Sequence, residues 1–213
     1  MDAWKIVYET FSYTNHTVLP EALEKWSVDL IGHLLPRHLE LIYLVNFYFL
    51  ERIQKDFPGQ VDKLTNMSII EESSPKKVRM ANLSIIGSHK VNGVAALHTK
   101  LLKSNLFPDF NSYYPKKFIN KTNGVTPRRW IYSANRPLAT LYTERMGGEE
   151  EWLTNLDLLT NLTDLADDDD FQQEWIEVRR INKLRLKKWV KEHCDGLEIP
   201  DNAIYEVMAK RFH

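Results

Sequence analysis

The sequence predicts a mostly helical segment that is incomplete as a domain. Apolar residues recur every three or four positions over long stretches, as on one face of a helix. Residues 39–53 are apolar on almost all sides, which is typical of a helix buried within a larger protein. The apolar run 202–209 indicates a strand, and a strand needs a neighbour to pair with. Together these observations predict part of a larger fold.

Composition excludes several classes of protein. Lys plus Arg total 28 and Asp plus Glu total 29, so no strong field of one sign exists to recruit nucleic acid or an anionic membrane. Hydrophobic residues make up 43% of the chain, too many for a disordered protein. The only cysteine, Cys194, cannot form an internal disulfide and favours a reducing compartment, the cytoplasm. The first residues lack the features of a secretory signal, and the most apolar stretch, 39–50, is shorter than the roughly twenty residues of a membrane span.

In the first half of the chain, prolines mark where helices are expected to begin. Pro20 suits a first helical turn, and apolar residues follow it at helical spacing: Leu23, Trp26, Leu30, Ile31 and Leu34. Pro36 opens the next helix, whose apolar side chains would each contribute roughly 1.5–3 kcal/mol if fully buried. A helical pattern also covers 91–102. The Pro- and Tyr-rich stretch 107–117 has few periodic features and is predicted to be a loop at a boundary.

The second half begins with a predicted turn and contains one long helix. Asn123-Gly124 favours a turn because both residues tolerate positive φ, and Pro127 suits the first position of the helix after it. Arginines at 128–129 have the wrong sign for a helix N-terminus, so they are expected to meet carboxylates or an anion, unless they are simply solvated. The acidic run 167–170 is interpreted as the start of a helix through residue 193, and a metal site is the less favoured alternative.

Several common catalytic motifs are absent from the sequence. It has no glycine-rich phosphate loop and no Gly-x-Ser-x-Gly elbow. His89 and His98 have no cysteines at zinc-binding spacing. The basic cluster 76–79 is short and is interpreted as solvated surface.

Three longer segments resemble signatures of the glycogen/starch (α-1,4-glucan) phosphorylase family. Residues 14–26 read TNHTVLPEALEKW, residues 80–95 read MANLSIIGSHKVNGVA, and residues 121–130 read KTNGVTPRRW. They occur in the family's order, and LPRH at 35–38 also fits. MAKRFH at 208–213 fits too, with Phe212 where the family usually has an aliphatic residue. The resemblance covers essentially the whole chain.

This resemblance implies a fold and an activity. The family has the α/β, two-domain GT-B glycosyltransferase fold, of which this chain would be an incomplete slice. Residues 1–121 would end the N-terminal, sugar-side domain, and residues 122–213 would begin the C-terminal domain that holds pyridoxal 5'-phosphate. The reaction is reversible phosphorolysis of glycogen, starch or maltodextrin by inorganic phosphate to give glucose 1-phosphate, with retention at the anomeric carbon. The full-length family protein is a homodimer and cytoplasmic.

The resemblance also assigns three residues to the sugar. His16 and Asn123 match the histidine and asparagine that contact the glucosyl unit at its 6-hydroxyl, and an imidazole and an amide can share one hydroxyl. Val94 matches a residue that lines the sugar pocket. Without the resemblance, His16 would be a loop or N-cap residue, Asn123 a turn residue and Val94 a residue that packs a helix.

Three further residues are assigned to the cofactor and phosphate. Trp130 matches an aromatic residue beside pyridoxal phosphate. Lys210 matches the lysine facing the cofactor phosphate, and Arg211 matches the arginine facing the substrate phosphate. An ammonium and a guanidinium fork both suit phosphate oxygens. Read from residue type alone, Trp130 would be a core residue and the Lys-Arg pair solvated surface.

The resemblance leaves two hypotheses about this chain. The family's Schiff-base lysine has no counterpart in it, so the first hypothesis is a phosphorylase segment that is inactive alone. The alternative is a non-catalytic remnant that binds glucan or docks onto a phosphorylase. Under either, the apolar helix and the run 202–209 are expected to leave exposed apolar patches and poor solubility.

Overall fold

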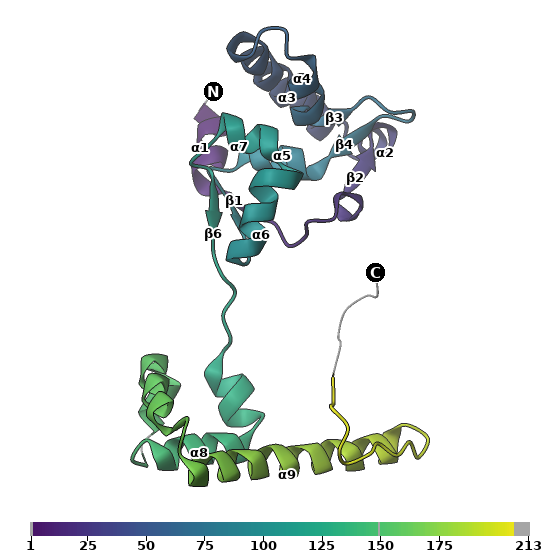
Figure 1. Cartoon of the computed structure of the whole chain (residues 1–213). Coiled ribbons are helices and arrows are strands. Elements are labelled where there is room, and N and C mark those ends of the chain that lie inside the picture. Colours follow the sequence, from purple (N-terminus) through teal and green to yellow (C-terminus); the bar gives the residue numbers. More distant parts are fainter. Residues whose placement is uncertain (1, 149, 207–213) are drawn as a thin grey trace. The chain divides into compact units, whose positions relative to one another are not determined.

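The computed structural model describes residues 2–148 and 150–206 and is mixed α/β, with more helix than strand. The chain divides into two compact units, Met1–Asn123 and Gly124–His213, which are described separately (Figure 1). The predicted mostly helical α/β character is therefore confirmed.

Unit 1 combines helices with two small sheets. Its helices are α1 (Asp2–Thr10), η1 (Pro20–Ala22), α2 (Val28–Leu34), α3 (Pro36–Asp56), α4 (Val61–Met67), α5 (Met80–Gly87), α6 (Ala96–Leu101), η2 (Leu102–Leu106) and α7 (Pro108–Tyr113). Its strands are β1 (Ser12–Thr14), β2 (Lys25–Ser27), β3 (Ile70–Glu71), β4 (Lys77–Arg79), β5 (Lys90–Gly93) and β6 (Phe118–Asn120).

One sheet of unit 1 is parallel and has the order β1-β5-β6. Tyr13 pairs with Val91, and Val91 pairs with Phe118. Val91 and Phe118 are buried, and the chain passes from β5 to β6 through α6, η2 and α7. Parallel strands need a crossover connection of this kind. Within it, α6 contacts β5 and β6 and lies next to the sheet, as Figure 1 shows.

The second sheet is antiparallel, with the order β2-β4-β3, and it corrects one predicted helix. Pro20 begins only a single 3₁₀ turn, and Trp26 lies on β2, paired with Val78. The helix begins at Val28, where the Ser27 hydroxyl accepts the Leu30 N–H at 3.1 Å. Strand pairing therefore overrides the apparent helical spacing that begins at Pro20.

Helix α3 forms where it was predicted, but most of its apolar surface is not buried within this chain. Its buried residues are Asn46, Phe49 and Ile53. Phe47 is 61% exposed and Tyr48 55% exposed. Unit 1 covers only one side of the helix, so the predicted all-round burial is not found here. The expected exposed apolar side chains are confirmed.

Two other predicted boundaries in unit 1 were wrong. The helix expected over 91–102 is a strand, β5, followed by the short helix α6. The stretch 107–117, predicted to be a loop, contains α7 and contributes Phe107 and Phe110 to the core. Phe110 stacks on Phe49, with ring centroids 6.1 Å apart. Packing of aromatic side chains against distant residues therefore determines the structure of 107–117, and such packing leaves no periodic pattern in the sequence.

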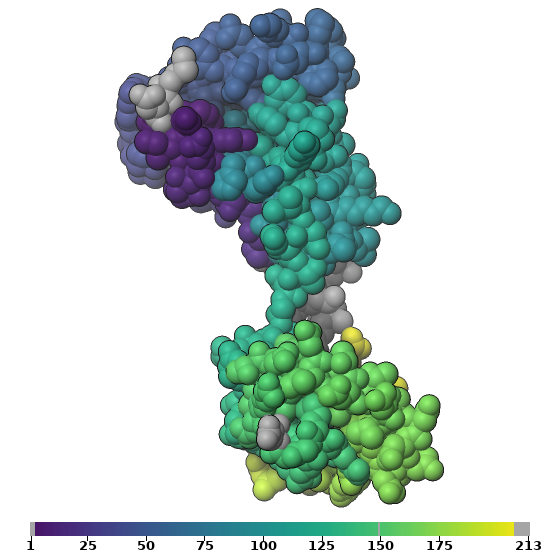
Figure 2. Space-filling model, turned by 90° about the vertical axis from the view of Figure 1, so that its left-hand side faces the viewer, coloured from purple at the N-terminus to yellow at the C-terminus, as the bar shows by residue number. Residues whose placement is uncertain are grey.

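Helix α1 shows how distant segments meet in unit 1. Figure 2 shows the purple N-terminal residues beside teal residues from the middle of the chain. The Trp4 side chain packs against the core. The Tyr8 ring lies 4.9 Å from the ammonium of Lys117, which is only 4% exposed. Burial lowers the pKa of Lys117 to about 8, and its ammonium donates to the Ile85 carbonyl at 2.9 Å.

The regular secondary structure of unit 2 is all helical in its described residues. Its elements are η3 (Arg128–Ser133), α8 (Arg136–Arg145), η4 (Glu150–Leu153), η5 (Leu156–Leu165) and α9 (Asp169–His193). Ala139, Trp152 and Leu153 form its core. The predicted long helix is confirmed as α9, and the Asp168 carboxylate caps it by accepting the Phe171 N–H at 2.7 Å.

Three predictions for the second half need correction. Residues 121–126 form no turn, and neither Asn123 nor Gly124 has positive φ. Arg128 donates to the Leu153 carbonyl at 3.0 Å, and neither Arg128 nor Arg129 meets a carboxylate among the described residues. Both arginines are exposed, which fits the alternative of solvated side chains. Residues 202–206 form a turn and irregular chain instead of a strand, and no neighbouring strand pairs with them among the described residues. The rest of that predicted strand lies outside the described residues.

In the parts of the chain that the structure describes, no helix is long and apolar enough to cross a membrane. The same parts contain no cluster of side chains that could hold a metal ion. Cys194 is exposed and carries a free thiol.

Candidate functional site

Three of the predicted site residues follow the carboxyl ends of three adjacent parallel strands. His16 comes two residues after β1, Val94 directly follows β5, and Asn123 comes three residues after β6. Carboxyl ends of parallel strands lie at one edge of a sheet, where α/β proteins commonly bind ligands. The topology therefore brings these three positions to one edge of the β1-β5-β6 sheet.

The end of β1 is held in place by buried polar contacts of Asn15. This residue is 1% exposed, and its N–H donates to the Asn92 carbonyl at 2.9 Å. Its amide oxygen accepts the Thr17 N–H at 2.9 Å, and its amide nitrogen donates to the Tyr13 hydroxyl at 3.0 Å. The oxygen contact closes an Asx-turn with His16 in the middle, so the exposed His16 side chain lies at the tip of a fixed turn.

The end of β5 is packed tightly against α6. A Cβ on Gly93 would overlap the Thr99 hydroxyl and come within 2.9 Å of the Thr99 backbone nitrogen and Cα, so only glycine fits without a shift. The Val94 N–H donates to His98 Nδ1 at 3.0 Å. This contact makes Nδ1 an acceptor and places the proton of the neutral ring on Nε2. Nε2 is buried and has no partner among the described residues.

The end of β6 is joined to β5 beyond the last strand residues. Lys121 N–H donates to the Gly93 carbonyl at 3.1 Å, and Asn123 N–H donates to the Val94 carbonyl at 2.9 Å. The Asn120 amide oxygen accepts the Thr99 hydroxyl at 3.2 Å. The backbone of Asn123 is thereby fixed beside Val94, while its side chain is exposed.

This edge offers an imidazole, a carboxamide and an apolar side chain. His16 and Asn123 can each donate and accept hydrogen bonds, and both are exposed. Val94 is half-buried and offers an apolar contact. It follows β5, the strand between β1 and β6 in the sheet. Such a set can bind a neutral polyhydroxylated ligand, which needs both donors and acceptors.

Trp130 lies in unit 2, on η3, and is 60% exposed. This corrects the alternative that it is a core residue. The Arg129 guanidinium lies 5.5 Å from its ring centroid. An exposed indole beside a cation fits one side of a phosphorylated aromatic cofactor. Lys210 and Arg211 lie outside the described residues.

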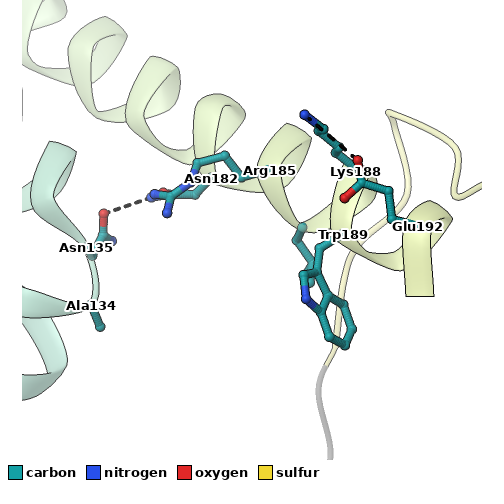
Figure 3. A pocket seen from close by; sticks show the side chains of 8 residues that line it. Ala134, Asn135, Asn182, Arg185, Lys188, Trp189 and Glu192 are labelled. Carbon is teal, nitrogen blue, oxygen red and sulfur yellow. Dashed lines mark hydrogen bonds and ion pairs between the residues drawn. The ribbon is translucent and has the colours of Figure 1, made fainter. Parts of the chain in front are cut away.

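A concave site that does not involve this sheet edge lies within unit 2, between α9 and the start of α8. Its volume is about 600 Å³, and Figure 3 shows the Asn182 amide donating to Asn135 across it at 2.8 Å. Trp189, from α9, also lines it and is 54% exposed. None of the predicted site residues that the structure describes lines this hollow.

Sequence reasoning missed Asn15, His98 and Thr99, which hold the backbone at the sheet edge. Asn15 could have been found, because an asparagine followed by two residues of a loop is a common Asx-turn signal. The His98 and Thr99 contacts carry no local signal, since they depend on how α6 packs against β5.

Comparison with known proteins gives a consistent result along the whole chain. A model of the carbohydrate phosphorylase family, described as "Phosphorylase: Carbohydrate phosphorylase", matches residues 1–213.

Individual relatives agree with this match. "Glycogen phosphorylase 2" of Dictyostelium discoideum is 50% identical over 212 residues, which are 100% of this chain and 21% of that protein. "Glycogen phosphorylase" of Saccharomyces cerevisiae is 50% identical over 220 residues, covering 100% of this chain and 24% of that protein. "Glycogen phosphorylase, muscle form" of Bos taurus is 46% identical over 211 residues, covering 99% of this chain and 25% of that protein. The chain thus spans between a fifth and a quarter of these relatives, and it belongs to the carbohydrate phosphorylase family.

Proposed function

We propose that this chain forms part of an α-1,4-glucan phosphorylase, and that the carboxyl edge of the β1-β5-β6 sheet binds the glucosyl unit that is transferred. The observation that carries the proposal is the meeting of His16, Val94 and Asn123 at that edge. These three residues were assigned to the sugar from three separate sequence segments.

In this proposal the two exposed polar side chains share one hydroxyl of the sugar. His16 and Asn123 would act as donor and acceptor to the 6-hydroxyl, and Val94 would contact an apolar face of the ring. The Asx-turn at Asn15 and the backbone contact between Asn123 and Val94 support this role, because they fix both positions before the sugar binds.

The phosphate-side residues complete the proposed reaction. Trp130 and Lys210 would hold pyridoxal 5'-phosphate, and Lys210 and Arg211 would neutralise the phosphate charges. When bound, the cofactor supplies a phosphate group that exchanges a proton with the substrate phosphate. Inorganic phosphate and the end of the glucan are the substrates, and glucose 1-phosphate is the product.

The broader setting is also a proposal. Residues 1–121 and 122–213 would belong to the two domains of a GT-B fold, in a homodimeric, cytoplasmic full-length protein. The 213-residue chain alone is expected to carry out no phosphorolysis, because none of its residues corresponds to the family's Schiff-base lysine.

A chimera tests this proposal. The matching segment of the S. cerevisiae relative is replaced by this chain, which aligns over its whole length at 50% identity. We expect the folded, cofactor-loaded chimera to release glucose 1-phosphate from glycogen and phosphate. A folded chimera that binds glycogen but releases no glucose 1-phosphate would favour a non-catalytic glucan-binding remnant instead.

A further inference from the structure

We propose that Asn15 is a positioning residue, which holds His16 in the orientation needed to meet the sugar. This inference rests on the proposed function, because it concerns how His16 is presented. Asn15 itself cannot contact a ligand from its place in the fold, since its side chain is 1% exposed.

The backbone N–H and both side-chain polar atoms of Asn15 have partners. Its backbone N–H extends the β1–β5 pairing by one residue, to the Asn92 carbonyl. Its amide oxygen accepts the Thr17 N–H, on the far side of His16. The backbone on both sides of His16 is therefore tied to one buried side chain and to the central strand of the sheet.

The turn continues beyond Thr17, which limits the movement of the segment further. The Thr17 hydroxyl accepts the Leu19 N–H at 3.1 Å. Two successive side-chain turns thus replace regular structure between β1 and η1. His16 is the exposed residue between Asn15 and the half-buried Thr17, so its direction follows from these contacts.

The Tyr13 contact has a different purpose. The Asn15 amide nitrogen donates to the Tyr13 hydroxyl at 3.0 Å, in a partly buried contact that does not involve the turn at His16. Burial raises the pKa of Tyr13, so its hydroxyl stays protonated at neutral pH. The oxygen of Asn15 therefore orients His16, whereas its nitrogen contributes to core stability. Variants can separate the two effects.

The experiment uses the chimera and a matched pair of variants. N15D keeps an oxygen for the Thr17 N–H and can accept a hydrogen bond from the Tyr13 hydroxyl, so kcat/KM is expected within about threefold of the parent. N15L has nearly the same shape but no polar atom, and a loss of at least about fivefold is expected. Each variant is also made with H16A.

The coupling between the Asn15 and His16 variants shows whether Asn15 acts through His16. If Asn15 acts through His16, the N15L/H16A double variant is within about twofold of H16A alone. Additive losses, or an N15D loss as large as that of N15L, would overturn the inference.

If N15L does not fold, N15S replaces it, because serine keeps an acceptor for the Thr17 N–H but loses the Tyr13 contact. N15S should melt at a lower temperature yet stay within about threefold in kcat/KM. A tenfold loss in N15S would overturn the proposal.

These outcomes are separate from the test of the proposed function. Failure of that function appears in the parent chimera, as a folded protein that makes no glucose 1-phosphate. Failure of the present inference appears only when an active parent is compared with its Asn15 variants.

Discussion

Replacing Gly93 by alanine should destabilise unit 1 substantially, because the new Cβ meets backbone atoms. It would come within 2.9 Å of both the nitrogen and Cα of Thr99, besides overlapping the Thr99 hydroxyl. A flexible side chain could rotate away, but the first turn of α6 would have to move. Overpacking of this kind costs about 1–3 kcal/mol. Loss of the Thr99–Asn120 hydrogen bond adds about 0.5–1.5 kcal/mol.

Hydrogen exchange of the 213-residue chain measures this effect locally. The Val91 N–H, which donates to the Lys117 carbonyl at 3.0 Å, reports the opening free energy of the parallel sheet. G93A should lower that free energy by about 2–4 kcal/mol. The double variant G93A/T99A should recover only part of the loss, because removing the hydroxyl leaves both backbone contacts.

Gly124 provides a matched control. A Cβ there would have no neighbour within 4 Å, and its φ is not positive. G124A should change the exchange of the Val91 amide by less than about 0.5 kcal/mol. A G93A loss below about 1 kcal/mol, or full rescue by T99A, would refute the reasoning about the β5–α6 contact.

Three further predictions concern the chain alone. The lowered pKa of Lys117, about 8, means that between this pH and about 10.5 the unfolded chain holds a proton that the folded chain has lost. The free energy of unfolding should therefore rise with pH in that window, by no more than about 3 kcal/mol, and K117M should remove the rise in urea titrations. H98L should destabilise the chain by about 1–3 kcal/mol relative to H98N in the same titrations, because only asparagine keeps an acceptor for the Val94 N–H. D168A should cost about 1 kcal/mol in thermal melting of α9, through loss of its N-cap, whereas D167A should cost less than about 0.5 kcal/mol.

The sequence was sufficient to predict features that depend on neighbouring residues. Helix α9 could be located because an acidic cap precedes a regular apolar spacing and basic residues follow, all within one segment. The helix containing residues 39–53 was found because Pro36 and the apolar run after it also lie within one segment. Its exposure could not be predicted, because exposure depends on which other parts of a protein cover it.

Features that depend on distant pairing were missed. Strand β1 pairs with β5 although Thr14 and Asn92 are 78 residues apart, and strands of three or four residues are too short to show a period of two. Trp26 was therefore assigned to a helix. The positions His16, Val94 and Asn123 came from a family resemblance, whereas their convergence on one sheet edge required the pairing of β1, β5 and β6.

The central claim, that the sugar binds at the carboxyl edge of the parallel sheet, is tested most directly by two histidine variants of the chimera. His16 follows β1 at the carboxyl edge, whereas His89 precedes β5 at the opposite edge, where its Nδ1 lies 2.8 Å from the Phe11 carbonyl. The measurement is kcat/KM for phosphorolysis of glycogen by folded, cofactor-loaded protein. We predict a loss of at least about tenfold for H16A and less than about threefold for H89A. Equal losses in the two variants, or a larger loss for H89A, would contradict the account.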